Sequence, residues 1–324
     1  MKRRFAIALI GAALSAGLPM YSAAQAYPSK TVTLVVPYAA GGATDTVARL
    51  YADALRKEAQ QTFIVENKPG ANGLIAMEYV SRAPKDGTVI LVGNPATNAL
   101  LPVTGKAKFD IEKAFLPVAR LATVPGVLVA ARKLSAKNVK ELVDYARKNP
   151  GKVSYASAGN GSLAHLNFLA LEEQAGIDMI HVPYKGGPQA LTDNLAGLVD
   201  LNFLNLSSAL PLVKDGKLTA LAVSGDSRLE QLPAVATMPE QGFQDSSGGN
   251  WQGLFLPAGT PPAIVDRLVV LASKASENPE LRAQLKAASM MLDPTASPAD
   301  FKKFLDTESG SFRRLIQKHN IIIE

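Results

Sequence analysis

Short apolar runs alternate along the chain with segments in which apolar residues recur every three or four positions. Residues 31–37 (TVTLVVP) are rich in β-branched residues and almost wholly apolar, which is typical of a strand buried on both faces of a sheet. From Val47 onward, apolar residues return at the spacing of one helix face. Strands that alternate with helices predict an α/β protein, and we expect a mostly parallel sheet.

The same alternation continues to the end of the chain. Helices are predicted at residues 71–83, with Asn72 as the N-cap, and at residues 138–150 and 162–176. Further strands are predicted at residues 63–70, 86–94, 126–132, 153–159, 178–184, 198–206 and 218–225. Three helices that start at prolines are predicted at residues 261–276, 278–289 and 297–320.

The N-terminal segment has a pattern of its own. Three basic residues at positions 2–4 precede an apolar run at residues 5–20, and Ala-Gln-Ala follows at 24–26. This order predicts a secretory signal peptide that is cleaved after Ala26. A membrane anchor is the alternative, but the run is short for a bilayer span and no basic residues flank its far end. We therefore expect export, and a mature chain that is soluble in the periplasm.

Composition excludes several classes of function. The 324 residues include no cysteine, so disulfides, thiolate metal sites and a cysteine nucleophile are excluded. The formal net charge is +6, three of it in the leader, and no Lys/Arg block with interleaved aromatics appears, so we expect no nucleic-acid partner. His165, His181 and His319 lack metal-site spacing, and no P-loop or complete dinucleotide motif is present. We therefore expect neither a metal nor a cofactor.

One corner of the sequence occurs twice. Val-Pro-Tyr followed by Gly-Gly and then Thr-Asp is found at residues 36–45 and again at 182–193. In parallel sheets, ligands bind where strands end and helices begin, and the unpaired N–H groups of a helix N-terminus favour anions. Residues 157–162 (SAGNGS) and 93–98 (GNPATN) are further corners of this kind. We infer two α/β lobes whose anion-binding corners face each other across a cleft.

Four segments carry a resemblance to a known family. Residues 27–49, 65–93, 182–201 and 251–268 resemble the tripartite tricarboxylate transporter receptors, the Bug family of periplasmic solute-binding proteins. The resemblance covers essentially the whole mature chain. It implies a type II periplasmic binding protein, in which two α/β lobes close on a small ligand, usually a carboxylate, for a membrane transporter. We expect the ligand to be a small organic carboxylate, either a dicarboxylate or an aromatic acid. We expect a monomer.

The resemblance also implies a domain division and a set of site residues. We place lobe 1 at residues 27–124 and 225–324, and lobe 2 at 125–224. Family members commonly have Asp where this chain has Leu204, which disfavours amino acids as ligands. The residues expected at the ligand are Tyr38, Ala40, Gly41, Gly42, Ala43, Thr44, Asp45, Asn94, Thr97, Ser157, Gly159, Asn160, Ser162, His165, Tyr184, Lys185, Gly186 and Asn205.

Several of these residues have a purely structural interpretation as well. Glycine pairs permit tight strand-to-helix turns, most lysines are solvated, and the tyrosines can be packing residues. Thr44 and Asp45 can cap the helix that they begin, and Pro188 suits the first turn of the helix after 182–187. Trp251, the only tryptophan, is expected to pack within lobe 1.

Two other functions remain as alternatives. Ser162 and His165 lie three residues apart on one predicted helix, so their side chains can be neighbours. A secreted esterase or amidase could use them as nucleophile and base. The chain has no G-x-S-x-G elbow, however, and helix capping explains the serine. A binding protein that reports to a signalling partner, in place of a permease, is the second alternative.

Overall fold

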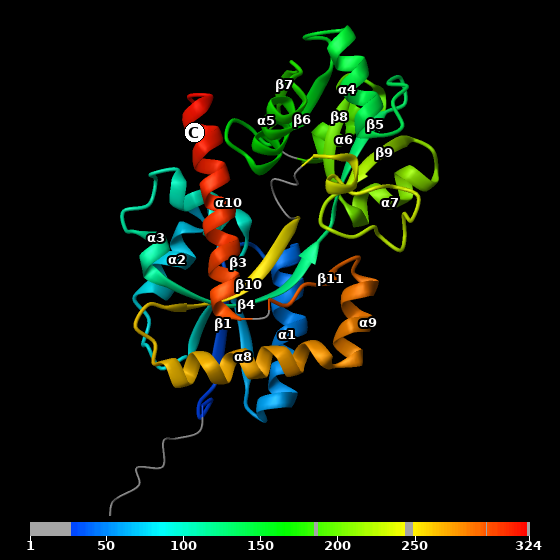
Figure 1. Ribbon diagram of the computed structural model, residues 1–324. Coiled ribbons are helices and arrows are strands. Elements are labelled where there is room, and N and C mark those ends of the chain that lie inside the picture. The colour runs from blue at the N-terminus through cyan, green and yellow to red at the C-terminus, as the bar shows by residue number, and fades with distance from the viewer. Residues whose placement is uncertain (1–26, 185–186, 244–248, 296, 323–324) are drawn as a thin grey trace, which may run out of the picture.

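Two lobes, each built around its own β-sheet, make up the protein (Figure 1). The computed structural model describes residues 27–184, 187–243, 249–295 and 297–322. The predicted signal peptide therefore lies outside the described residues, as do Lys185 and Gly186. In the described part of the chain, no helix combines the length and the hydrophobicity needed to cross a bilayer. The predicted two-lobed α/β fold is confirmed.

The sheet of lobe 1 has six strands in the order β11-β4-β10-β3-β1-β2. The strands are β1 (Val32–Val36), β2 (Phe63–Asn67), β3 (Val89–Gly93), β4 (Phe115–Val124), β10 (Asn250–Pro257) and β11 (Met291–Leu292). Side chains alternate between the two faces of a strand, so Leu34 and Val35 enter different cores. Both faces are covered by helices, which explains why every residue of β1 except Thr33 is apolar.

Helices α1, α8 and α9 pack on one face of this sheet, and α2 and α10 pack on the other. The helices of lobe 1 are α1 (Ala43–Ala59), α2 (Leu74–Ser81), α3 (Ile111–Ala114), α8 (Pro262–Glu277), α9 (Pro279–Ala287) and α10 (Pro298–Lys318). Short helical turns add η1 (Ala71–Gly73), η2 (Ala96–Leu100) and η3 (Leu101–Val103). Trp251 is fully buried against Phe301 and donates from Nε1 to Glu308 Oε2 at 2.9 Å, so its expected packing role is confirmed.

The sheet of lobe 2 has five strands in the order β7-β6-β8-β5-β9. The strands are β5 (Gly126–Ala131), β6 (Ser154–Ser157), β7 (Ile180–Pro183), β8 (Leu201–Asn205) and β9 (Leu218–Val223). The helices are α4 (Val139–Lys148), α5 (Leu163–Ala175), α6 (Gly187–Ala196) and α7 (Leu206–Lys214). Helices α4 and α5 bury one core against the sheet, and α7 buries another on the opposite face. The turn η4 (Pro239–Gln241) follows β9.

Two expectations need correction. The sheets are mixed: β1 runs parallel to β2 and β3, but β10 is antiparallel to β3 and β4, and β5 is antiparallel to β8 and β9. Strands β4 and β5, which lead the chain from lobe 1 into lobe 2, take part in these antiparallel pairs, and so does β10, with which the chain returns to lobe 1. Asn72 is also not a helix cap, because it sits inside η1 with a φ of 54° and Gly73 is the N-cap of α2.

The chain leaves lobe 1 at the end of β4 and enters β5 through Pro125. The Pro125 carbonyl accepts a hydrogen bond from Leu206 N (2.9 Å), and Gly126 N donates to Ser224 Oγ (2.7 Å). Asn250, the first residue of β10, pairs with Val124, the last residue of β4. The outgoing strand and the incoming strand therefore lie side by side where the lobes join.

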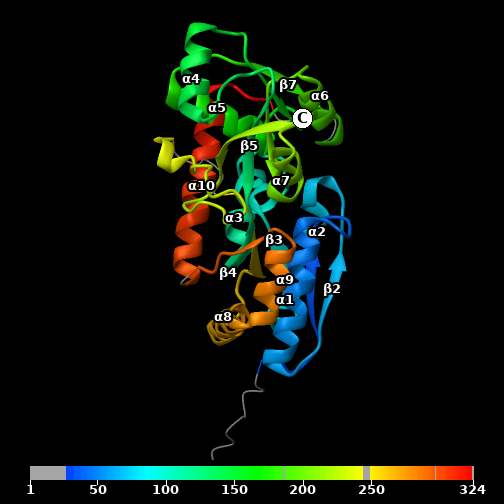
Figure 2. The ribbon, with the colours of Figure 1, turned by 90° about the vertical axis from the view of Figure 1, so that its right-hand side faces the viewer.

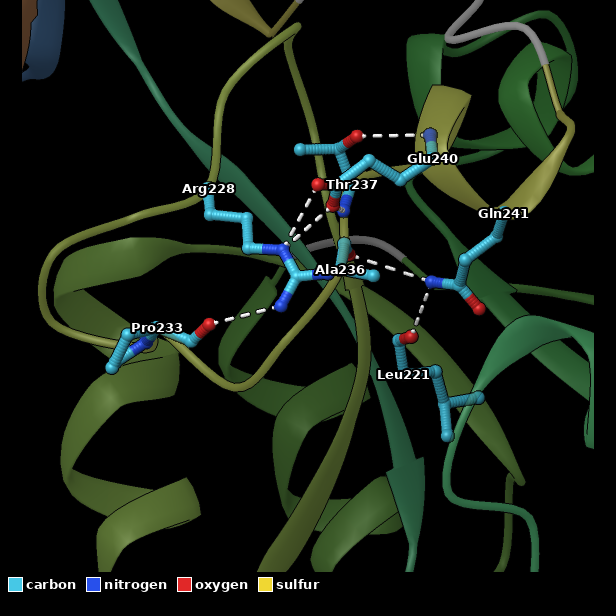
Figure 3. Close-up of polar contacts among 7 residues, drawn as sticks. All are labelled: Leu221, Arg228, Pro233, Ala236, Thr237, Glu240 and Gln241. Carbon is cyan, nitrogen blue, oxygen red and sulfur yellow. Dashed lines mark hydrogen bonds and ion pairs between the residues drawn. The ribbon is translucent and has the colours of Figure 1, made fainter.

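The segment that follows β9 is folded onto lobe 2 (Figure 3). Thr237 and Glu240 cap each other reciprocally: Glu240 N donates to Thr237 Oγ1 and Thr237 N donates to Glu240 Oε2. Arg228 Nε donates to the same carboxylate, and Gln241 Nε2 donates to the carbonyl of Leu221 on β9. Although the division at 224/225 stays a prediction, these contacts favour a boundary after residue 243.

Helix α10 forms a third link between the lobes, without a covalent connection (Figure 2). Its lower half packs on the sheet of lobe 1, and its last turns contact α5 of lobe 2 through a shared apolar core. At this contact, the carboxylate of Glu173 on α5 is bound by the side chains of Arg314 (2.6 Å), Lys318 (3.0 Å) and His319 (2.8 Å). We call Glu173 with Arg314, Lys318 and His319 the interlobe ion cluster.

Candidate ligand-binding site

In lobe 1, two loops at the carboxyl ends of β1 and β3 are joined into one cluster. Tyr38 Oη donates to Asn94 Oδ1 at 3.1 Å, and Asn94 Nδ2 lies 3.4 Å from Thr44 Oγ1. Thr97 N donates to the same Asn94 oxygen at 3.1 Å. Asn94, Thr97 and Thr44 are buried. The structure therefore brings together the predicted residues of these two loops.

Asp45 is buried beneath the first loop, and both of its oxygens are occupied. Oδ2 accepts from Gly41 N (2.9 Å) and Arg49 Nε (3.0 Å), and Oδ1 accepts from Asn67 Nδ2 (2.9 Å). Burial alone would raise the pKa of Asp45, but these hydrogen bonds and the Arg49 charge bring it below the usual value. Asp45 is therefore an ionised anchor of the loop.

The expected capping roles of Thr44 and Asp45 need correction. The N-cap of α1 is Gly42, which has no side chain, and Asp45 instead binds the N–H of Gly41 ahead of the helix. Gly41 has a φ of +89°, so the turn itself favours glycine there. Ala40, Gly41 and Gly42 are exposed, and Ala43 is half-buried. The N-terminus of α1 consequently remains open to a ligand.

In lobe 2, the corresponding loop joins β6 to α5. Ser162 is the N-cap of α5, with Oγ accepting from His165 N at 3.4 Å, as predicted. Gly161 N donates to His165 Nδ1 at 3.0 Å, and Gly159 N donates to Ser157 Oγ at 3.0 Å. Ser157 and His165 are buried, whereas Asn160 is exposed at the tip of the loop. This corner places a second helix N-terminus at the surface.

Tyr184 extends the same corner from β7. Its backbone N–H donates to the Ser157 carbonyl (2.9 Å), and its hydroxyl donates to Asp193 on α6 (2.9 Å). Pro188 lies in the first turn of α6, as predicted. Lys185 and Gly186 lie outside the described residues, so their part in the site stays a prediction.

Asn205 ends β8 opposite Gly126, beside the crossing between the lobes. It is exposed and is the N-cap of α7, without a side-chain hydrogen bond to the helix. Within the described chain, no hydrogen bond or ion pair connects the site loops of lobe 1 to those of lobe 2. A cavity of about 940 Å³ also separates the lobes, but it is lined by Arg120, Phe243 and Phe304 rather than by these loops.

The esterase alternative gains no support from this geometry. The Ser162 hydroxyl accepts from the backbone N–H of His165, and the imidazole accepts from Gly161, so the side chains lack the bond that activates a nucleophile. The contact of this type is instead between Ser157 Oγ and His181 Nε2, at 2.5 Å. Among the described residues, no group of His, Asp and Glu is arranged to hold a metal ion.

His181 is the residue of this region that sequence reasoning left out. Its ring stacks on that of His165 with 4.0 Å between centroids and 7° between planes. It also stacks on Tyr155, at 5.2 Å. The two histidines are 16 positions apart on different elements, so sequence spacing alone offered no signal for this pair.

Comparison with known proteins identifies the family. Residues 47–321 match the model of the tripartite tricarboxylate transporter family receptor, TctC. The chain belongs to this family. It is 31% identical over 262 residues to Protein BugT of Bordetella pertussis, covering 80% of each chain. The family consists of periplasmic solute-binding receptors. The match confirms the family that the sequence resemblance indicated.

Two solved structures share the same fold. A TctC solute-binding protein from Polaromonas, without ligand, matches 90% of this receptor and 99% of its own chain with 30% identity and a TM-score of 0.81. Rpa4515 of R. palustris, solved with adipate, matches 91% of the receptor and 99% of its own chain with 30% identity and a TM-score of 0.73.

Proposed function

We propose that this receptor binds a small organic acid with two carboxylates and delivers it to the membrane subunits of a tripartite transporter. The observation that carries the proposal is the pair of open helix N-termini, α1 in lobe 1 and α5 in lobe 2, each preceded by a glycine-containing loop. First-turn N–H groups lack intrahelical acceptors and carry partial positive charge, so each N-terminus can hold one carboxylate. Adipate in Rpa4515 is a diacid and supports this assignment.

The acids near the site support a ligand without an amino group. Asp45 is bound to Gly41, Arg49 and Asn67, and Asp193 accepts from the Tyr184 hydroxyl. Leu204 is apolar at a position where the family resemblance implies Asp. Charge-assisted hydrogen bonds to a carboxylate contribute about 1.5–3 kcal/mol each, whereas an ammonium buried without an acidic partner costs several kcal/mol. We therefore expect a diacid to bind more tightly than its α-amino counterpart.

Ligand binding would act by shifting the population of lobe arrangements. A diacid that contacts both N-termini favours a closed form, which the membrane partner can distinguish from the open one. The higher TM-score to the ligand-free relative than to the adipate-bound relative, at the same identity, supports an open arrangement for the structure described above. The absence of polar contacts between the described site loops of the two lobes agrees with this interpretation.

The test is calorimetry on the purified mature receptor. Adipate, glutarate and succinate are compared with glutamate and aspartate at fixed pH and salt. We expect at least one diacid to bind, and glutarate and succinate to bind at least tenfold more tightly than glutamate and aspartate, a difference of about 1.4 kcal/mol. Tighter binding of both amino acids would contradict the proposed ligand class, and loss of their advantage in Asp45→Asn would make Asp45 the ammonium partner.

A substitution at the first helical position separates the site from the fold. Ala43→Asp places a negative charge at the N-terminus of α1, where it stabilises the helix but repels a bound anion. Ala43→Asn has nearly the same shape without the charge, and serves as the control. We expect Ala43→Asp to bind the diacid at least tenfold more weakly than Ala43→Asn, with equal or higher thermal stability. Equal affinities would place the carboxylate elsewhere.

We further propose that the receptor is exported and cleaved after Ala26, as residues 2–26 suggest. Mass spectrometry of the periplasmic fraction should give a chain that starts at Tyr27.

A further inference from the structure

We propose that His165 and His181 form a pair that positions the ligand loop Ser157–Ser162, with one imidazole bound to each end of the loop. This inference rests on the proposed function, because it assigns a role to residues around one of the two helix N-termini. Neither histidine needs to touch the ligand in this role. The pair would act by holding the loop amides and the start of α5 in the geometry that accepts a carboxylate.

The two contacts lie at opposite ends of the loop. His181 Nε2 is 2.5 Å from Ser157 Oγ, and Ser157 Oγ accepts in turn from Gly159 N at 3.0 Å. At the other end, His165 Nδ1 accepts from Gly161 N at 3.0 Å. Gly159 and Gly161 have φ values of +111° and +71°, which residues with a side chain rarely adopt. A loop with this backbone needs fixed partners to keep one conformation, and the imidazoles supply two of them.

The pair is itself attached to the core of lobe 2. The imidazole rings are parallel, with 4.0 Å between centroids, and Tyr155 stacks on His181. Tyr155 stacks in turn on Phe168 at 4.3 Å, and both of these rings are fully buried. The histidines come from different elements, α5 and β7, so their stacking also fixes the helix against the sheet edge. The loop is thereby connected to the buried core of the lobe.

The protonation states agree with this arrangement. His165 Nδ1 can accept from Gly161 only when it carries no proton. Burial is the main cause that lowers the pKa of His165 to about 4, with the nearby His181 and His319 adding to the effect. Burial also lowers the pKa of His181. Both rings are therefore neutral at pH 7, and the proton of His165 resides on Nε2.

The test exploits the two different ring nitrogens. Asn places its side-chain oxygen near the position of Nδ1, and Gln places its terminal atoms near the position of Nε2. At position 165 the contact uses Nδ1, so His165→Leu should weaken diacid binding about tenfold and His165→Asn should recover most of it, but His165→Gln should not. At position 181 the contact uses Nε2, so the order should reverse: His181→Gln recovers binding and His181→Asn does not.

The outcomes are decisive in both directions. The reversed order of rescue supports positioning by the pair. Rescue of position 165 by Gln rather than by Asn would indicate that Nε2 contacts the ligand directly, and would overturn the positioning role. Leu variants that bind like the parent would overturn it as well. Tyr145→Phe, on the exposed surface of α4, is a control that should leave binding unchanged.

A second measurement keeps this inference separate from the proposed function. Amide hydrogen exchange of the ligand-free receptor reports on the loop without any ligand. Exchange within residues 157–165 should be at least tenfold faster in His165→Leu than in His165→Asn. Absence of diacid binding in the parent, together with this difference in exchange, would contradict the proposed function but not the pair. Equal exchange in the two variants would overturn the pair even if the receptor binds diacids.

Discussion

Glu173→Gln should destabilise the receptor, because it removes the centre of the interlobe ion cluster. The carboxylate side chain is only 13% exposed and is bound by Arg314, Lys318 and His319. Gln has nearly the same shape and volume, so packing in the shared core of α5 and α10 should be retained. The measured difference in stability will therefore report mainly on the charge.

The magnitude follows from the pKa of Glu173. Burial alone would raise it, but hydrogen bonds from Arg314, Lys318 and His319 and the charge of Arg314 lower it from 4.5 to about 2. A difference of this size corresponds to about 3 kcal/mol of stability at pH 7. The side chains of Arg314 and Lys318 are more than half exposed, so solvent and salt screen their attraction to Glu173. We therefore expect a loss of about 1–2 kcal/mol.

The assay is urea unfolding followed by circular dichroism at pH 7 and low salt. Because the pKa is lower in the folded state, the cluster stabilises fully above pH 4.5, and its contribution declines as the pH falls toward 2. The difference in free energy of unfolding between the parent and Glu173→Gln should become smaller as the pH falls over this range. It should also become smaller in 1 M salt. Glu112→Gln is the matched control, because it removes the exposed Arg313–Glu112 pair (2.9 Å) within lobe 1.

Two outcomes would refute this reasoning. One is a loss below about 0.5 kcal/mol, the range of ordinary surface pairs. The other is an equal loss of stability in Glu112→Gln, which would mean that the interlobe ion cluster stabilises the receptor no more than an exposed pair within one lobe.

Two further predictions concern motion and stability. Small-angle scattering should give a smaller radius of gyration with a saturating diacid than without ligand, because closure brings the lobes together; an unchanged radius would contradict closure from the open form. Gly310→Ala should stabilise the receptor by about 0.5–1 kcal/mol, since Gly310 lies inside α10 and no atom lies within 4 Å of an added Cβ. A lower thermal midpoint in that variant would show that α10 needs a flexible residue there.

Most of the regular structure could be predicted because each element has a local signal. The apolar runs of β1, β5 and β9 and the periodic faces of α4 and α8 were recovered within a few residues of their observed bounds. The strands β4 and β10 were not predicted. Pro117 and Arg120 interrupt β4, and both are accommodated by distant parts of the chain.

Those distant contacts explain why no local pattern revealed β4. Pro117 pairs with Phe255 beside an irregularity in the strand register, where a missing N–H is tolerated. The Arg120 guanidinium is bound by Asp293 and lies over the ring of Phe304. Sequence patterns register neighbours along the chain, and these partners are more than 130 positions away.

In the candidate site, too, the features with a local signal could be predicted and those that depend on distant contacts could not. The family resemblance pointed to the loops, whose part in ligand binding stays a prediction, and local chemistry correctly assigned Ser162 as a cap. Both carboxylate oxygens of Asp45 accept hydrogen bonds, and the ring of His181 stacks on that of His165. These contacts depend on how separate elements pack, so neither could be derived from the sequence. The capping role expected for Asp45 was wrong because Gly42 takes that position and the carboxylate reaches back to Gly41.

The position of β10 has a consequence for the order in which the receptor folds. β10 lies between β3 and β4, which are not otherwise neighbours, so without it the sheet of lobe 1 is in two parts. Lobe 2 is completed by one continuous stretch, whereas lobe 1 must wait for residues beyond 249. A nascent or truncated chain that ends before Asn250 lacks both β10 and β11, so it would leave both edges of β4 and one edge of β3 unpaired. Unpaired strand edges are the usual sites of β-aggregation. The late strand thus makes lobe 1 the part that depends on protection before folding, and lobe 2 the part able to form first.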